Sequence, residues 1–145
     1  MNKIMGLDVG DATVGIAISD GLLITAQGRE TLRRSQIKED LNHIIDYILE
    51  ENIHVIVVGF PKNMNNSIGP QAEKTLQFVK QLKKKIKYSD RNIHEVEVVM
   101  WDERLTSIAA DKMMIQADLS RKKRSEIIDK IAAVYILQGY LDSLS

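Results

Sequence analysis

The segment Lys3–Gly21, KIMGLDVGDATVGIAISDG, decides how the first part of the chain folds. Two apolar, β-prone runs flank Gly10, Asp11 and Ala12, and this spacing predicts an antiparallel hairpin with those residues at its tip. Asp8 lies within the first apolar run, where strand propensity and desolvation both disfavour a carboxylate. Asp8 therefore needs a hydrogen-bond donor, a cation or a metal ion as a partner. The ordinary alternative is that Asp8 accepts a hydrogen bond from the backbone of its own turn.

The composition describes one globular domain spanning residues 1–145, with 44% apolar and 28% charged residues. No apolar stretch approaches the roughly 20 residues that a membrane span requires, and the N-terminus lacks the features of a signal peptide. The chain has no cysteine, which excludes disulfides and zinc–thiolate sites and is consistent with a cytoplasmic protein. Its formal net charge is zero, so any affinity for nucleic acid must come from local basic clusters.

Hydrophobic periodicity predicts the remaining elements. A strand that is typical of a sheet edge is expected at Ile24–Leu32, and an amphipathic helix should follow with Ser35 as its N-cap. The continuous apolar run Ile53–Phe60 indicates a strand that is covered on both faces. Gly69 and Pro70 suit the N-cap and first position of the next helix. Further helices and one strand are predicted at 71–86 (helix), 94–101 (strand), 105–117 (helix) and 126–144 (helix).

This order predicts an α/β fold with one mixed central sheet of five strands, three antiparallel and then two parallel, flanked by helices. Right-handed crossovers place the fourth and fifth strands beside the first, which becomes central. Asp8, the loop after Phe60 and the pair Asp102–Glu103 then meet at one edge of the sheet. Ligands of open α/β sheets bind at such carboxyl ends. Glu103 has an ordinary alternative role, as a salt-bridge partner or a favourable charge at the start of a helix.

Asp129 is the third carboxylate of interest. On a helix it shares a face with Ala132, Ala133 and Ile136, and the two alanines allow the helix to approach the sheet closely. Several ionised carboxylates brought together there would repel one another and lose hydration. A divalent cation held between them removes both costs. Oxygen ligands without His or Cys favour Mg²⁺ or Mn²⁺ over zinc.

Four blocks of the chain together resemble the YqgF family, which is also called the RuvX or Holliday-junction-resolvase-like family. They are GLDVGDATVGIAISD, VVGFPKNMNNSIGPQAE, WDERLTSIAADKMM and DKIAAVYILQGYLDS, and they occur in the order of the family. The resemblance implies a ribonuclease-H-like fold. It also implies a metal-dependent nuclease, a hydrolase of phosphodiester bonds that processes the precursor of 16S ribosomal RNA during ribosome biogenesis. An older role proposed for the family is Holliday junction resolution.

The family's acidic positions fall on Asp8, on Glu103 rather than the adjacent Asp102, and on Asp129. The resemblance implies that these three residues are catalytic and hold one or two Mg²⁺ or Mn²⁺ ions. The chain departs from the family at the hairpin turn, where Gly10-Asp11-Ala12-Thr13 has no basic residue. A phosphate contact expected at this turn must then come from elsewhere, and Asp11 is a possible outer metal ligand through water.

A basic run, Arg121, Lys122, Lys123 and Arg124, lies in the predicted connection before the last helix. We expect it to contact the phosphates of precursor ribosomal RNA or branched DNA. The alternative is a solvated surface segment. Two other interpretations of the whole chain stay open. One is a non-catalytic nucleic-acid-binding or ribosome-assembly module. The other is an actin-like ATPase lobe, which is less well supported because the chain has room for one lobe only. The sequence is compatible with a monomer or a homodimer.

Overall fold

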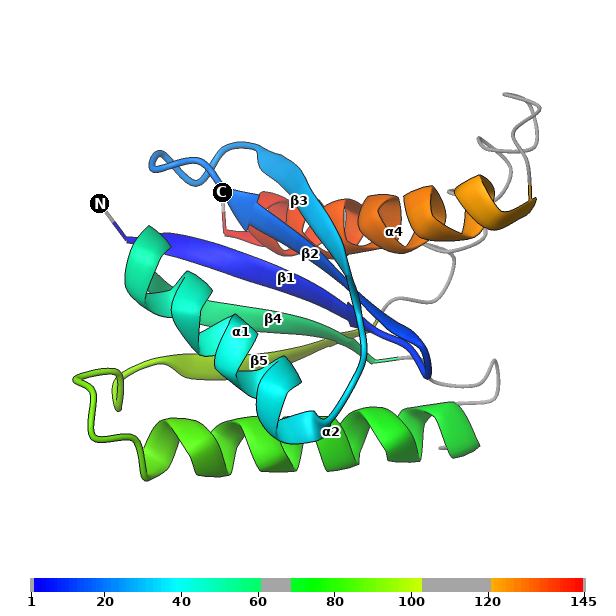
Figure 1. Ribbon diagram of the computed structural model, residues 1–145. Coiled ribbons are helices and arrows are strands. Elements are labelled where there is room, and N and C mark those ends of the chain that lie inside the picture. The colour runs from blue at the N-terminus through cyan, green and yellow to red at the C-terminus, as the bar shows by residue number, and fades with distance from the viewer. Residues whose placement is uncertain (1, 61–68, 103–120, 145) are drawn as a thin grey trace.

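A five-stranded mixed sheet forms the centre of the molecule, and helices cover both of its faces (Figure 1). The structure is a computed structural model that describes residues 2–60, 69–102 and 121–144; for residues 121–129 it describes the backbone alone. The strands are β1 (Lys3–Val9), β2 (Thr13–Ser19), β3 (Ala26–Arg33), β4 (Ile53–Phe60) and β5 (Glu97–Asp102). The helices are α1 (Ile37–Glu51), α2 (Pro70–Lys87) and α4 (Arg121–Ser143). The predicted helix at 105–117 lies outside the described residues.

The strands follow the spatial order β3-β2-β1-β4-β5. β1 pairs antiparallel with β2 and parallel with β4, while β5 adds to β4 in parallel. β1 is therefore the central strand, and β3 is an edge strand. These pairings confirm the mixed sheet and the strand order that the sequence predicts.

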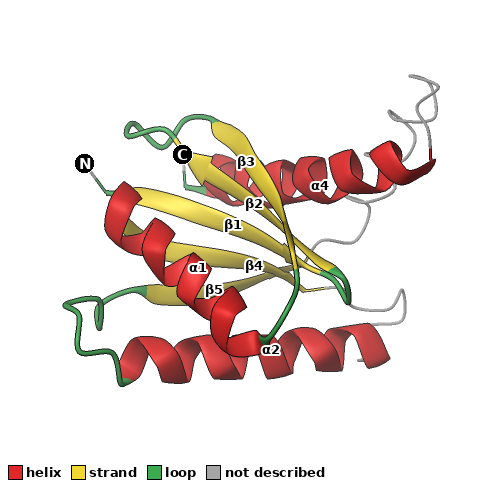
Figure 2. Ribbon diagram, viewed as in Figure 1, coloured by secondary structure: helices red, strands yellow, loops and turns green. Residues whose placement is uncertain are grey.

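Helices lie on both faces of the sheet (Figure 2), and each face has its own apolar core. Helices α1 and α2 cover one face, where buried side chains such as Leu7, Ile44 and Leu82 pack together. Helix α4 covers the other face, with Ile4, Ala17, Val57 and Ile136 among the packed residues. β4 has buried side chains on both faces, as its continuous apolar sequence predicts.

Helix α4 packs very closely against β1 at Gly6. A Cβ atom added to Gly6 would lie 2.7 Å from Cβ of Leu137 and 3.1 Å from the carbonyl oxygen of Ala133. Ala132 and Ala133 are fully buried, which confirms that the alanine side of this helix faces the sheet. The close approach positions the whole helix relative to β1, and with it the backbone of Asp129.

Two predicted boundaries shift because side chains capture backbone donors. The third strand begins at Ala26 rather than Ile24, since the Asp20 carboxylate accepts hydrogen bonds from the N–H groups of Ile24 and Thr25 at 2.8 and 2.9 Å. Ser35 is not the N-cap of α1. That position belongs to Gln36, and the Asp40 carboxylate instead reaches back to the N–H of Ser35 at 3.1 Å.

Two further boundaries also differ from the predictions. β5 begins at Glu97 rather than His94, because residues 93–96 form a turn in which the N–H of Val96 donates to the carbonyl of Ile93 at 3.1 Å. The basic residues Arg121–Arg124 belong to the first turn of α4 instead of a connection. Lysine and arginine are good helix formers, so a basic run is compatible with this earlier start.

Gly69 and Pro70 begin α2 as predicted. Among the helices described, none is long and apolar enough to cross a membrane.

Candidate active site

Asp8 lies near the end of the central strand, on the face that α4 covers. In the antiparallel pairing with β2 it lies opposite Gly15. On the other side of β1, Leu7 pairs with Val58, so the following residue Gly59 lies beside Asp8 in the same register. Neither neighbour has a side chain. Asp8 itself is half-buried.

Trp101 continues this row of residues on β5, because it pairs with Gly59. The indole makes an edge-to-face contact with Tyr140 of α4, with ring centroids 5.6 Å apart. Trp101 therefore lies on the α4 face, and alternation along the strand directs Asp102 to the opposite face. Asp102 pairs with Phe60 at the end of β4 and is exposed. Glu103 lies outside the described residues.

The start of α4 approaches the same edge of the sheet. Gln138 hydrogen-bonds to the backbone of Ile24 and Ala26, whereas Lys130 packs over Gly28, which lies further along β3. From Gln138 back to Lys130, the helix therefore advances toward the end of β3, where Arg33 pairs with Thr13 beside the hairpin tip. The backbone of Asp129 lies one helical turn before Ala133, on the part of α4 directed toward this edge. Its side chain is outside the described set, as are those of Arg121–Arg124.

The hairpin tip is held by side chains from elements far away in the sequence. Arg34 donates from its guanidinium to the carbonyl of Gly10 at 2.7 Å, and Gln71 donates from its amide to the carbonyl of Val9 at 3.2 Å. Lys74 forms an ion pair with Asp11 at 3.0 Å. Two cationic side chains therefore reach the turn that itself has no basic residue.

Arg34 is the central residue of this arrangement. Its guanidinium carbon lies 5.3 Å from the centroid of the Phe78 ring, a cation–π distance. Its Nε lies 3.6 Å from Oδ2 of Asp40, which is too long for a hydrogen bond but close enough for an ion pair. Asp40 is almost fully buried, so the arginine compensates a charge that would otherwise be costly. Sequence patterns contain no signal for these contacts, since they depend on how α1 and α2 pack.

The position of Asp8 fits a hard divalent cation. A carboxylate supplies the oxygen ligands that Mg²⁺ and Mn²⁺ prefer. Among the residues whose side chains the structure describes, no three His, Asp or Glu residues gather as a metal site. Two of the three predicted carboxylates, Glu103 and Asp129, are not part of that set. The pairing with Lys74 makes Asp11 less suitable as an outer ligand.

Comparison with known proteins gives consistent results over the whole chain. The family model described as "RuvX: Holliday junction resolvase" matches residues 2–143. A protein of Clostridium tetani, named as a candidate pre-16S rRNA nuclease, is 55% identical over 142 residues, covering 98% of this chain and 97% of its own length. A protein of Desulforamulus reducens with the same name is 52% identical over 141 residues and covers 97% of each chain.

Solved structures with the same fold come from Holliday junction resolvases. RuvC of T. thermophilus in complex with a Holliday junction substrate has a TM-score of 0.58 at 15% identity, covering 99% of this chain and 96% of its own. The Holliday junction resolvase of fowlpox virus has a TM-score of 0.53 at 18% identity and covers 99% of both chains. At this level of identity the likeness shows the fold alone, and it confirms the predicted ribonuclease-H-like architecture.

Proposed function

Because the chain belongs to the RuvX family, we propose that it is a divalent-metal-dependent nuclease that processes the precursor of 16S ribosomal RNA. Its relatives cover nearly the full length of the chain at more than half identity, and they are named for that activity. The structural observation that carries the proposal is the location of Asp8. This half-buried carboxylate lies near the end of the central strand, in register with Gly15 of β2 and on the face that α4 covers.

Asp8, Glu103 and Asp129 are the proposed metal ligands and catalytic residues. Support for Glu103 comes from the sequence, since it directly follows Asp102, the last residue of β5, and ligands of open α/β sheets bind at the carboxyl ends of the strands. Support for Asp129 comes from its backbone position one turn before Ala133, on the part of α4 directed toward the sheet edge. Nucleases of this fold class generally use divalent metals. Such ions, when bound, activate a water and stabilise the leaving oxygen of the phosphodiester.

The chain's own residues then position the substrate. Carboxylates repel a phosphate backbone, so cationic side chains must hold it near the site. Arg121, Lys122, Lys123 and Arg124 are the proposed contacts. As residues of the first turn of α4, they lie about one and a half to two helical turns before Asp129. They would hold phosphates without reading the base sequence. A ribosomal RNA substrate implies that the protein works in the cytoplasm.

A Holliday junction is the main alternative substrate, because the description of the family names it. The experiment that separates these functions uses purified protein with precursor 16S ribosomal RNA and with four-way DNA junctions, each in Mg²⁺, Mn²⁺ or EDTA. We expect metal-dependent cleavage of the RNA that EDTA abolishes. Cleavage of the junction alone would reassign the substrate. Binding of either nucleic acid without cleavage in any metal would identify a non-catalytic module and refute the proposed activity.

A further inference from the structure

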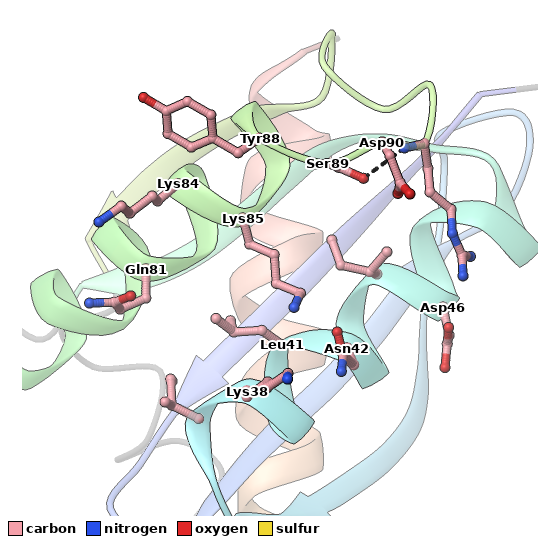
Figure 3. Close-up of a pocket in the computed structure, with 13 residues that line it drawn as sticks. Lys38, Leu41, Asn42, Asp46, Gln81, Lys84, Lys85, Tyr88, Ser89 and Asp90 are labelled. Atoms are coloured by element: carbon pink, nitrogen blue, oxygen red, sulfur yellow. Dashed lines mark hydrogen bonds between the residues drawn. The ribbon is translucent and has the colours of Figure 1, made fainter.

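A groove runs between α1 and α2, on the face of the sheet opposite to α4 (Figure 3). It has a volume of about 960 Å³, within the range of binding sites for small ligands. We call it the α1–α2 groove, and the residues that matter here are Lys38, Leu41, Asn42, Lys84, Lys85 and Arg91. It plays no part in the site proposed above, which lies on the α4 face.

The groove is cationic although the protein as a whole is neutral. Four cationic side chains line it against two carboxylates, an excess of two positive charges in a chain of zero formal net charge. The cationic residues are Lys38, Lys84, Lys85 and Arg91, and the anionic residues are Asp46 and Asp90. Within the described part of the chain, none of these six residues takes part in the ion pairs found. The two carboxylates therefore offset only part of the positive charge of the groove lining.

Two of the cations come from different helices and face one another. Figure 3 shows the amines of Lys38 on α1 and Lys85 on α2 directed into the same space, with the amide of Asn42 beside them. Like charges that converge across a gap repel each other unless an anion lies between them. The amines and the amide are hydrogen-bond donors suited to phosphate oxygens. The arrangement therefore suits a phosphate group.

The floor of the groove is apolar, and an exposed aromatic residue lies at its rim. Leu41 is buried beneath the polar groups, Ile37 is 40% exposed, and Tyr88 is 71% exposed. A sugar ring or base can pack on such a surface while its phosphates meet the lysines. An acidic peptide would match the charges but would leave the tyrosine and the apolar floor without a stacking partner.

The groove also has a path to the proposed active site. Helix α1 begins shortly after Arg33, which pairs with Thr13 next to the hairpin tip, so Lys38 lies near that edge of the sheet. Along α2, Lys85 lies about 16 Å from Lys74, which contacts the tip at Asp11. A nucleic acid strand leaving the carboxylates can thus pass the tip and enter the groove.

We propose that the α1–α2 groove binds the sugar–phosphate backbone of the RNA that flanks the cleaved bond. This inference rests on the proposed function, since it assigns a second contact to the same substrate. The groove increases affinity for long substrates and takes no part in the chemistry.

The test compares two variants with the same change in net charge. In the first, Lys38→Glu and Lys85→Glu reverse the facing charges of the groove. In the second, Lys80→Glu and Lys83→Glu reverse two exposed lysines of α2 that do not line it. Binding of precursor 16S ribosomal RNA is measured in EDTA over a range of salt concentrations, with circular dichroism to confirm folding. If a Glu variant does not fold, the matched Gln pairs replace it.

The groove variant should bind the long RNA roughly tenfold more weakly than the control variant at low salt. The slope of its log affinity against log salt should fall by roughly 0.7 for each phosphate that the groove no longer neutralises. Both variants should cleave an RNA too short to reach the groove at the wild-type rate in Mg²⁺.

Equal affinity of the two variants for long RNA would overturn the inference. Binding of polyglutamate is measured in the same way. If the groove variant loses it and keeps RNA binding, the groove is a site for an acidic protein segment instead. Absence of wild-type cleavage would refute the proposed function independently.

Discussion

The ammonium of Lys74 on α2 lies 3.0 Å from the carboxylate of Asp11 in the turn between β1 and β2. The turn itself has no basic residue, so the cation beside it comes from α2. Both side chains are more than half exposed, and exposed ion pairs contribute little to stability. The relationship is therefore of more interest for substrate binding than for folding.

Lys74→Ala should leave the melting temperature nearly unchanged and reduce affinity for RNA several-fold, because a cation beside the path of the phosphates is removed. Asp11→Asn should have the opposite effect on affinity, since it frees Lys74 from its partner. Both effects are measured by titration of labelled RNA at low salt. Equal affinities of Lys74→Ala and the wild type would mean that the pair serves only to hold the turn.

Asp8→Asn should preserve the fold and reduce phosphodiester cleavage by about a hundredfold or more, because the amide keeps the size of the side chain and removes the charge that holds a metal. The matched control is Glu50→Gln, which neutralises an exposed acid on α1, on the opposite face of the sheet. Cleavage is followed with Mg²⁺ and Mn²⁺. Wild-type activity of Asp8→Asn would make Asp8 a structural residue and remove it from the proposed site.

Gly6→Ala should destabilise the protein by about 1–3 kcal/mol, since the new methyl group would lie 2.7 Å from Leu137 and force α4 away from the sheet. Cleavage should fall as well, because α4 carries Asp129. Gly28→Ala is the control. The atom nearest to its added methyl group would be Cγ of Lys130 at 2.9 Å, in an unbranched side chain that can shift, whereas Gly6 faces the backbone and Cβ of α4 residues. Urea denaturation measures both variants, and equal destabilisation would show that the approach at Gly6 is adaptable.

Glu30 on β3 links the edge strand to α1 by accepting a hydrogen bond from Tyr47 at 2.7 Å and by pairing with His43. Burial raises the pKa of Glu30, but the hydrogen bonds from His43 and Tyr47 outweigh it and lower the pKa below the usual value of 4.5. A lowered pKa stabilises the folded state above pH 4.5, and this contribution is lost as the pH falls through the lowered value.

Glu30→Gln should therefore lower the free energy of unfolding by about 1 kcal/mol at neutral pH. The expected loss is small because the carboxylate is one-third exposed. The difference from the wild type should shrink as the pH falls below 4.5. Chemical denaturation at pH 7 and pH 3.5 measures it. A difference that is the same at both values would show that the charge of Glu30 is not involved.

Replacement of Arg121, Lys122, Lys123 and Arg124 by Ala should weaken RNA binding and reduce its salt dependence by roughly 0.7–0.9 log units for each phosphate that is no longer neutralised. Alanine favours helix, so the first turn of α4 should persist and the melting temperature should change little. Binding titrations at several salt concentrations test this expectation. An unchanged slope would show that the basic run is only a solvated helix start.

Much of the fold is predictable from local patterns. The hairpin follows from two β-prone runs around a short turn, and the apolar run Ile53–Phe60 matches β4 at both ends. The strand order follows from the handedness of crossovers, which is a general property of βαβ units. Boundaries are less predictable when a single side chain competes for backbone donors. The Asp20 carboxylate delays β3 to Ala26, and Asp40 engages Ser35 so that it is not the N-cap.

The sequence by itself determined the residue types and spacings: a carboxylate in an apolar strand at Asp8, an alanine face on the last helix, and the family to which the chain belongs. Only the tertiary structure decided which distant groups meet. It placed Gly15 and Gly59 on either side of Asp8 and brought Lys74 to a turn that contains no basic residue. It also directed Lys38 and Lys85 into one groove. The reason is physical. Periodicity and propensity act over a few residues, whereas these contacts depend on how helices pack against a sheet from opposite faces.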